Sequence, residues 1–444
     1  MLYGIQLTAL DLVCSLLAIT AVVLFGTSVR FRWIRPGHLI AFLVVKLILG
    51  FSFTISAVLT GVESDACGYF IGGQSYAAML RDLVRGDSVD YLRNTPFWWL
   101  DGRSTDRLVS LTGLFLVLTG GSFLGATAIA CAFGATGQLL LYRFFRERFP
   151  EVRALYFLPV LFHPSLMLWS GMLLKDSFGI FAMGSAVYSL HRLLGLRQLS
   201  ALVPLGLSIY VIFLFRSFIF LPLVAFVLFM IWDRVILPYS RRAGERGGIK
   251  ALYLIAASMT CLLALWTLVN RFGGNLIEDR LEGAATFSRI EAGSSFQNAE
   301  LSFGPSGILA LGMGVINSLF RPFPWDVFKL IQAAAAVENI LVIGFVWSGF
   351  HCFWKRISAQ QRRQFSGIYW GMLVVALIIA AGVGLFASNS GTISRYRIPM
   401  IPFLVAVPGV ALGMADSFAR MGRRFNRDGL RPRFELPRKS LRST

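Results

Sequence analysis

The sequence predicts an all-α polytopic membrane protein with about ten membrane-spanning helices and a few short re-entrant or interfacial ones. Of its 444 residues, 56% are hydrophobic and only 15% are charged, and the mean hydropathy is +0.67. Apolar windows of about 20 residues, the length that crosses a hydrocarbon layer roughly 30 Å thick, recur from end to end. We expect one transmembrane domain over residues 1–418, with outer loops at about 61–107 and 271–325 and a basic cytoplasmic tail over 419–444.

The net charge of +19 has a membrane explanation. Basic residues fall mainly in short loops between apolar windows and in the tail, a pattern that orients membrane proteins and attracts anionic lipid. Membrane lipids are therefore expected partners, and nucleic acid is not. Four histidines and five cysteines without CxxC spacing predict no metal site, and Cys67 has no second thiol in an outer loop for a disulfide.

The first two apolar windows fix the orientation of the chain. A span over about Leu7–Val29 is followed by the basic loop Arg30–Arg35, which places that loop inside and the N-terminus outside. The second span, about His38–Thr60, contains Lys46. Its ammonium either reaches back to the nearby cytoplasmic face or serves a buried functional role, and the short distance to that face favours the first.

The first outer segment, Gly61–Arg107, has helical spacing of polar and apolar residues and is expected to lie on the membrane. Leu108–Phe145 is too long for one upright helix and too short for two. We expect a short outer or re-entrant helix and then a span that starts near Gly120. Gly121 and Gly125 have the GxxxG spacing that predicts close helix packing.

Two hairpins are expected in the middle of the chain. Ala154–Leu190 crosses outward and returns, with Lys175 and Asp176 at the outer bend. Leu199–Trp232 repeats this path and carries one charge, Arg216, near its midpoint and hence near its outer turn.

The last third of the chain follows the same logic. The expected path is outward over 251–270, an outer segment over 271–323 that ends near Arg321, inward from about Asp326, outward over 366–386 and inward again to Asp416. The turn between the last two spans, Asn389–Pro402, contains Arg395, Tyr396 and Arg397. Arginines on the non-cytoplasmic side are unusual near helix ends, so each requires an anionic partner.

That partner is either a protein carboxylate or a ligand. Loop ion pairs with nearby acids explain any single arginine. Alternatively, several basic side chains converge on a diphosphate, whose oxygens guanidinium groups bind through paired hydrogen bonds. In an extended turn, residues i and i+2 point to the same side, which fits such a site, and at least Arg395 or Arg397 is expected to converge with one other basic residue. The predicted diphosphate-binding residues are Lys175, Arg216, Arg321, Arg395 and Arg397.

Transfer of a group onto a hydroxyl also requires a base, and Asp65 is the candidate. It follows the second span closely enough to meet a membrane-bound substrate, and partial desolvation is expected to raise its pKa toward a useful range. A solvated loop acid is the alternative. Glu63 and Asp65 together could bind a divalent cation through their carboxylate oxygens, but no cofactor is predicted from these two residues alone.

Four short motifs resemble those of polytopic bacterial glycan-assembly proteins, namely SDACGY, SGMLLKDS, RPFPW and NSGTISRYR. These proteins comprise the GT-C type glycosyltransferases and the repeat-unit polymerases of the Wzy kind. The resemblance implies a GT-C-like fold, a polyprenyl-diphosphate sugar donor, a carboxylate base at Asp65 and outer basic residues that hold the diphosphate. The chain departs from the common GT-C pattern because it has no adjacent acidic pair and no large soluble C-terminal domain.

From these observations we expect a multi-pass protein of the bacterial inner membrane that acts on the periplasmic side. It would transfer a glycan from a lipid-linked oligosaccharide to a sugar hydroxyl, for exopolysaccharide or another surface glycan, with other glycan-assembly proteins as further partners. The alternatives are a single-sugar transferase of the same architecture, a transporter or flippase, and a noncatalytic assembly subunit. Replacing Arg397 with alanine is expected to abolish the polymer.

Overall fold

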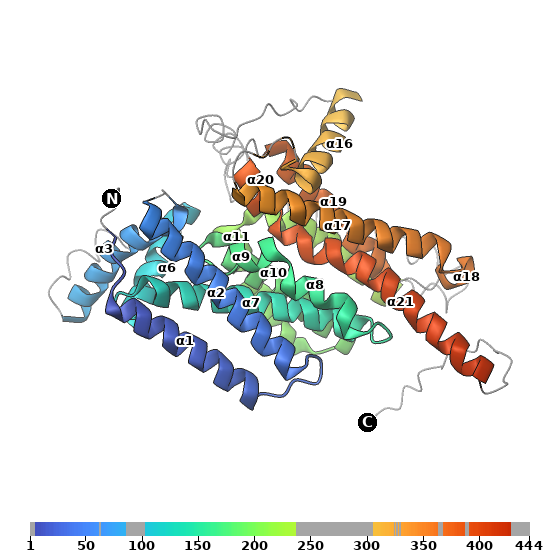
Figure 1. Cartoon of the computed structure of the whole chain (residues 1–444), viewed down its shortest axis with the longest axis horizontal. Coiled ribbons are helices and arrows are strands. Elements are labelled where there is room, and N and C mark those ends of the chain that lie inside the picture. The colour runs from blue at the N-terminus through green and yellow to red at the C-terminus, as the bar shows by residue number, and fades with distance from the viewer. Residues whose placement is uncertain are drawn as a thin grey trace.

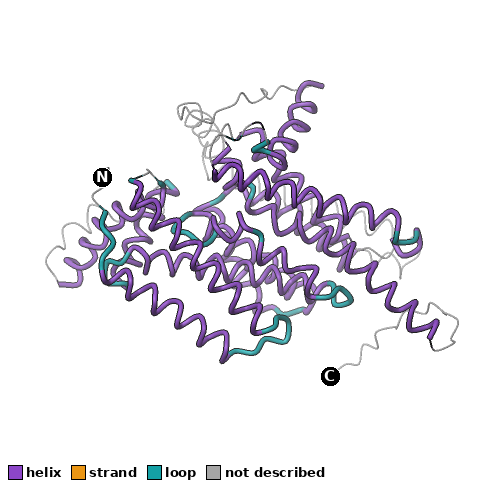
Figure 2. The backbone as a smooth tube through the Cα atoms, viewed as in Figure 1, coloured by secondary structure: helices purple, strands orange, loops and turns teal. Residues whose placement is uncertain are grey.

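The fold is entirely helical in the part of the chain that the structure describes. The computed structural model describes residues 5–61, 64–85, 103–236, 305–323, 325, 327, 330–362, 367–386 and 390–427. Every regular element in these ranges is a helix, and none of them contains a strand (Figure 2). The predicted span over 251–270 and the polar part of the second outer loop lie outside the described residues.

Seven described segments are long and apolar enough to cross a membrane, which confirms a multi-pass helical protein. A further apolar helix, α11, is shorter. Most of the predicted spans coincide with these helices to within a few residues. The seven segments are α1 (Ala9–Ser28), α2 (Pro36–Thr60), α7 (Phe123–Arg148), Ser217–Arg234 with α12 (Phe220–Ile231), α17 (Leu330–Lys355), α19 (Gly367–Phe386), and α21 (Ile401–Arg427) with the residues just before it.

The N-terminal helix is fixed to the bundle by a buried carboxylate. Thr8 and Asp11 form a capping box at the start of α1, in which the backbone N–H of each residue donates to the side chain of the other. The helix therefore begins at this point. The other oxygen of Asp11, Oδ1, accepts hydrogen bonds from Ser122 Oγ (2.8 Å) and Leu124 N (3.0 Å). Asp11 therefore joins α1 to the beginning of α7.

The short helix expected before the third span is α6 (Ser104–Leu118), which ends in a tight turn before α7. The predicted GxxxG packing is wrong. Gly121 lies in that turn with a φ of 96° and has nothing near the position of a Cβ atom, so it supplies backbone freedom instead of a helix contact. Close packing occurs farther along α7, at Gly137. A Cβ atom added to Gly184, on the helix Lys175–Leu196, would lie 2.1 Å from the carbonyl oxygen of Gly137.

The first predicted hairpin has an irregular outward arm. Instead of one span, the chain forms three short helices, and the second and third begin next to Pro159 and at Pro164 because proline cannot continue a preceding helix. A bend at 170–174 then leads into α10 (Lys175–Leu196). The pieces of the outward arm are η1 (Ala154–Phe157), α8 (Leu158–Phe162) and α9 (Pro164–Trp169).

The second hairpin is confirmed, with its charge at the turn. α11 (Leu202–Phe215) ends at Arg216, and the chain passes through the short helix η3 (Ser217–Ile219) into α12. Arg216 has φ −145° and ψ 60°, which is not helical. The break places a single arginine between two apolar helices.

Lys46 does not reach toward the membrane surface, and the expectation that it snorkels is wrong. Its side chain is fully buried, and its ammonium donates hydrogen bonds to Gln138 Oε1 (2.5 Å), Ser170 Oγ (2.7 Å) and Met167 O (3.3 Å). These neutral acceptors lie on α7 and at the end of α9, so Lys46 connects α2 to both. Three acceptors offset the cost of burying the charge.

The C-terminal helices pack beside this bundle (Figure 1). α21 packs against α17 and α19, and α19 packs against α12 and α16 (Pro305–Phe320). α21 continues to Arg427, beyond Asp416, where the last span was expected to end. The segment before α21 is the short helix α20 (Ser390–Tyr396), which approaches α9.

Candidate active site

Asp65 stands at the start of α3 (Asp65–Arg85), the helix formed by part of the segment predicted to be the first outer loop. Ser64 begins this helix, because its hydroxyl accepts a hydrogen bond from the N–H of Cys67 (3.3 Å). A carboxylate in the first turn is favoured by the positive end of the helix dipole. The Asp65 side chain is 50% exposed, so it is accessible to a substrate.

The bend before α10 contributes Lys175 and Asp176. The ammonium of Lys175 donates to the hydroxyls of Ser104 (3.0 Å) and Thr105 (2.8 Å) at the start of α6. It also lies 5.8 Å from the centre of the Tyr69 ring on α3. Asp176, the next residue, is almost completely buried and lies in the first turn of α10. The bend thus presents a partly exposed cation and a buried anion side by side.

Arg216 neutralises the buried carboxylate. Its Nη2 donates to both oxygens of Asp176 at 2.7 Å, and both side chains are buried. The guanidinium also lies 4.8 Å from the centre of the Tyr396 ring. An arginine and an aspartate buried together are stable only when they are paired, which explains why the charge at the second hairpin turn faces α10.

Arg395 links the exposed carboxylate to the buried one. Its Nη1 donates to Asp65 Oδ2 at 2.5 Å, while its Nε and Nη2 both lie 3.3 Å from Asp176 Oδ2. Its guanidinium is 5.8 Å from the ring centre of Trp169. Arg395 therefore joins α20 to the first turns of α3 and α10. We call Asp65, Lys175, Asp176, Arg216 and Arg395 the ionic cluster.

The ionic cluster carries more positive than negative charge. Three cationic side chains face two carboxylates, an excess of one positive charge in a partly buried site. Asp65 is half exposed, Lys175 is partly exposed, and Arg395 is 19% exposed. Such a site favours an anionic ligand at its exposed edge.

The expected rise in the pKa of Asp65 is wrong. Burial alone would raise the pKa, but the charges of Arg395, Lys175 and Arg216 together with the Arg395 hydrogen bond hold it below its ordinary value of 3.8. The cations outweigh the partial desolvation that the sequence suggested. Asp65 is therefore an ionised carboxylate engaged with Arg395 in this state.

Arg395 and Arg397 do not act together, because the turn that carries them is helical. Residues two apart on a helix point to nearly opposite sides, whereas the prediction assumed extended backbone. Arg397 is 3% exposed and contacts a different group, Glu338 on α17, with Nη2 to Oε1 at 3.7 Å. Its Nη1 donates to the backbone oxygens of Ser318 (3.5 Å) and Arg321 (3.3 Å).

These contacts form a second buried set at the junction of α9, α17 and the end of α16. Glu338 Oε2 accepts a hydrogen bond from Ser165 N (2.9 Å), and Oε1 lies 3.3 Å from His163 Nδ1. The Arg321 backbone accepts from Asn339 as well as from Arg397, and the Arg321 guanidinium lies 5.7 Å from the Phe323 ring centre. Of the six predicted site residues, the structure thus gathers Asp65, Lys175, Arg216 and Arg395 and places Arg397 and Arg321 in this other set.

Two acids were not assigned a role from sequence. Asp176 was noted beside Lys175, and its importance follows only from the two arginines that meet it. Glu338 is an acid inside an otherwise apolar span, a signal that by itself points to a partner in the protein interior. Among the residues that the structure describes, no group of three or more histidine, cysteine or acidic side chains is arranged to hold a metal ion.

Comparison with known proteins gives one family match. Residues 110–256, about a third of the chain, match the family model of the dolichyl-phosphate-mannose-protein mannosyltransferases. This is a glycosyltransferase family of the GT-C type, so the match supports the resemblance drawn from the short motifs and an enzyme of the glycosyltransferase class. The matched residues include Lys175, Asp176 and Arg216. No curated protein and no solved structure matches the chain.

Proposed function

We propose that this protein is a membrane glycosyltransferase that transfers a sugar or glycan from a polyprenyl carrier to a hydroxyl group at the ionic cluster. One observation carries the proposal. An accessible carboxylate, Asp65, is surrounded by cations from distant parts of the chain, at Lys175, Arg216 and Arg395. Transfer of a sugar from a phosphate carrier to a hydroxyl requires a base that accepts the hydroxyl proton. It also requires positive charge that stabilises the departing phosphate.

The first step assigned to the site is an exchange of partners on Arg395. A donor phosphate replaces Asp65 on Nη1, while Asp176 keeps its contacts with the Nε and Nη2 edge. Lys175 contacts the same phosphate from the other side of the exposed edge. Arg216 stays on Asp176 and supports Arg395 through that carboxylate.

The exchange changes Asp65 from an ion-pair partner into a base. Once the guanidinium binds phosphate, its effect on the carboxylate weakens and the pKa of Asp65 rises toward the ordinary range. Asp65 then accepts the proton of the acceptor hydroxyl as the new glycosidic bond forms. The bond from the sugar carbon to the carrier phosphate breaks, and its electrons remain on the phosphate oxygen that Arg395 and Lys175 neutralise.

Two donor classes fit this site. A diphosphate carrier with an oligosaccharide corresponds to a polymerase that makes exopolysaccharide or another surface glycan on the periplasmic face of the inner membrane. The name of the matched family describes a dolichyl phosphate donor with one phosphate and one mannose, which favours a single-sugar transferase as the second candidate. If the donor is a diphosphate, a divalent cation bound near Asp65 would help to neutralise it.

The test uses the lipid-linked glycan that accumulates in cells lacking the protein. Purified full-length protein in lipid vesicles is given this labelled glycan with an acceptor fraction from the same cells, with and without a chelator. Release of polyprenyl diphosphate and longer glycans supports the polymerase, and release of polyprenyl monophosphate supports the single-sugar transferase. Movement of the intact lipid-linked glycan across the vesicle membrane without release of carrier would make the protein a transporter and contradict the proposal.

Lys175 gives this proposal a pH dependence. Burial, with Arg216 and Arg395 nearby, lowers the pKa of the Lys175 ammonium to about 8, against an ordinary value of 10.5. The charged form that binds phosphate is therefore lost as the pH rises through about 8, and kcat/KM is expected to decline there. Lys175→Arg keeps its charge at high pH and is expected to move this decline upward. Identical alkaline limbs in the two pH profiles would remove Lys175 from donor binding.

A further inference from the structure

A groove outside the ionic cluster separates α17 and α21 at the ends that carry Arg356 and Asp416. The two helices touch closely at Gly349, where a Cβ would lie 2.3 Å from Pro408 Cβ. Pro408 lies inside α21 and cannot donate the usual backbone hydrogen bond of a helix interior. Between this contact and Arg356, α17 and α21 are separated by a groove.

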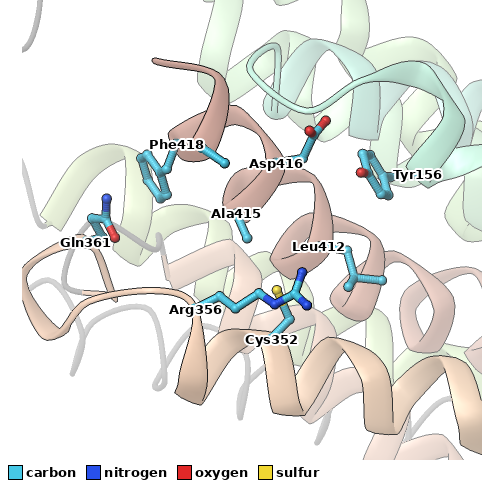
Figure 3. Close-up of a pocket in the computed structure, with 9 residues that line it drawn as sticks. Tyr156, Cys352, Arg356, Gln361, Leu412, Ala415, Asp416 and Phe418 are labelled. Atoms are coloured by element: carbon cyan, nitrogen blue, oxygen red, sulfur yellow. The ribbon is translucent and has the colours of Figure 1, made fainter. Parts of the chain in front are cut away.

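The groove has room for part of a ligand. A cavity of about 540 Å³ lies between the helices, and an adjoining one of about 340 Å³ shares Cys352, Arg356 and Leu412 with it. Each volume falls within the range of roughly 300–1,000 Å³ that is typical of small-molecule sites. Figure 3 shows Leu412, Ala415 and Phe418 on α21 across the groove from Cys352 and Arg356.

The polar groups of the groove favour an anion. Arg356 is exposed, and among the described residues no carboxylate lies within ion-pair distance of its guanidinium. Asp416, the one acid that lines the cavity, is engaged with Arg420 at 3.4 Å and Arg153 at 4.0 Å. The Arg356 charge is therefore available to a ligand, while the charge of Asp416 is balanced by protein.

The groove is continuous with the lipid-facing surface of α17. Trp347, which lines the second cavity, is 66% exposed on a helix long and apolar enough to span a membrane. Tryptophan in such a position lies in or next to the lipid layer. A ligand can therefore enter sideways from the bilayer, with an apolar part along Leu412 and Cys352 and a charged part at Arg356.

We propose that this groove binds an anionic phospholipid, with the phosphate at Arg356 and an acyl chain between α17 and α21. Charge selects this occupant over the chain's own C-terminal segment. Residues 421–444 contain eight basic and two acidic residues, so they would repel Arg356 and instead increase the local concentration of anionic lipid. The inference does not depend on the proposed glycosyl transfer.

The experiment measures lipid binding to the purified full-length protein in detergent by native mass spectrometry. Phosphatidylglycerol is expected to bind at least about tenfold more tightly than phosphatidylcholine. The phosphate of either lipid can accept a hydrogen bond from Arg356, but the cationic choline of phosphatidylcholine cancels the charge attraction that phosphatidylglycerol keeps. Arg356→Gln is expected to remove this preference. Ala415→Phe, which fills the groove and keeps Arg356, is expected to weaken binding of phosphatidylglycerol by a similar factor.

Lys355→Gln is the matched control, since it removes one positive charge from the neighbouring residue, which does not line the groove. It is expected to retain the preference for phosphatidylglycerol. Equal losses in the Lys355 and Arg356 variants would overturn the site, because the attraction would then come from general surface charge. Soluble glycerol phosphate that competes as well as phosphatidylglycerol would also overturn it, since the acyl chain would contribute nothing. Size-exclusion profiles and thermal midpoints confirm that each variant is folded.

Discussion

Replacing Arg395 with alanine is expected to lower the rate of glycosyl transfer about 100- to 1,000-fold, the range typical of removing one group that stabilises a developing negative charge. Arg395 is the residue that contacts both Asp65 and Asp176, so its loss removes the phosphate partner and the connection between the two carboxylates. Transfer from the labelled lipid-linked glycan by purified protein in vesicles is the measurement. Arg395→Lys keeps the charge but not the paired donors, and it is expected to recover only part of the rate.

The fold of the Arg395→Ala variant is expected to survive. Asp176 stays paired with Arg216 through two hydrogen bonds of 2.7 Å, so no buried carboxylate is left without a cation. Arg420→Ala is a suitable control because Arg420 forms a partly exposed ion pair with Asp416 on α21, outside the ionic cluster. A folded Arg395→Ala protein with wild-type turnover would show that the ionic cluster is an internal ion-pair network without a catalytic role.

Replacing Asp65 with asparagine is expected to lower kcat about 100- to 10,000-fold, the usual contribution of a general base. Asparagine preserves the size of the side chain but cannot accept the proton of the hydroxyl. Because Asp65 is half exposed and Arg395 retains Asp176, the thermal midpoint is expected to change little. Turnover is measured under saturating donor, so that a change in donor affinity is not mistaken for a change in chemistry.

Asp82→Asn provides the matched control for this prediction. Asp82 is an exposed acid on the same helix as Asp65, but it lies near the other end and has no part in the ionic cluster. It is expected to retain wild-type turnover. If Asp65→Asn turns over substrate as fast as Asp82→Asn does, the base is another residue and the assignment of Asp65 fails.

The pKa of Asp65 supplies a further check on the partner exchange. The neighbouring cations hold it below 3.8 in the free protein, so the carboxylate stays ionised from the acid range upward. A loss of kcat/KM caused by protonation of Asp65 is therefore expected only below that value. In the Arg395→Ala variant the main lowering influence is absent, and the acid limb is expected to move to higher pH.

The positions of charges at turns could be predicted from the sequence, whereas the partners of those charges could not. Arg216 and Lys175 were found because charged residues between apolar windows are confined to turns or bends. The separation of Arg395 from Arg397 was not predictable, because it depended on whether a short polar turn was extended or helical. Lys46 was misjudged for a similar reason, since Gln138 and Ser170 are distant in sequence and supply acceptors that no local pattern reveals.

The sequence by itself determined that this is a multi-pass helical membrane protein, where its main spans lie, and which basic residues stand at their ends. Hydrophobicity over about 20 residues is a local property, so it can be read directly from the chain. Only the tertiary structure decided that Asp65, Asp176, Arg216 and Arg395 meet while Arg397 pairs with Glu338. The partner of a buried charge is set by the packing of distant helices, because each such charge must be neutralised by whichever opposite group the fold brings within reach.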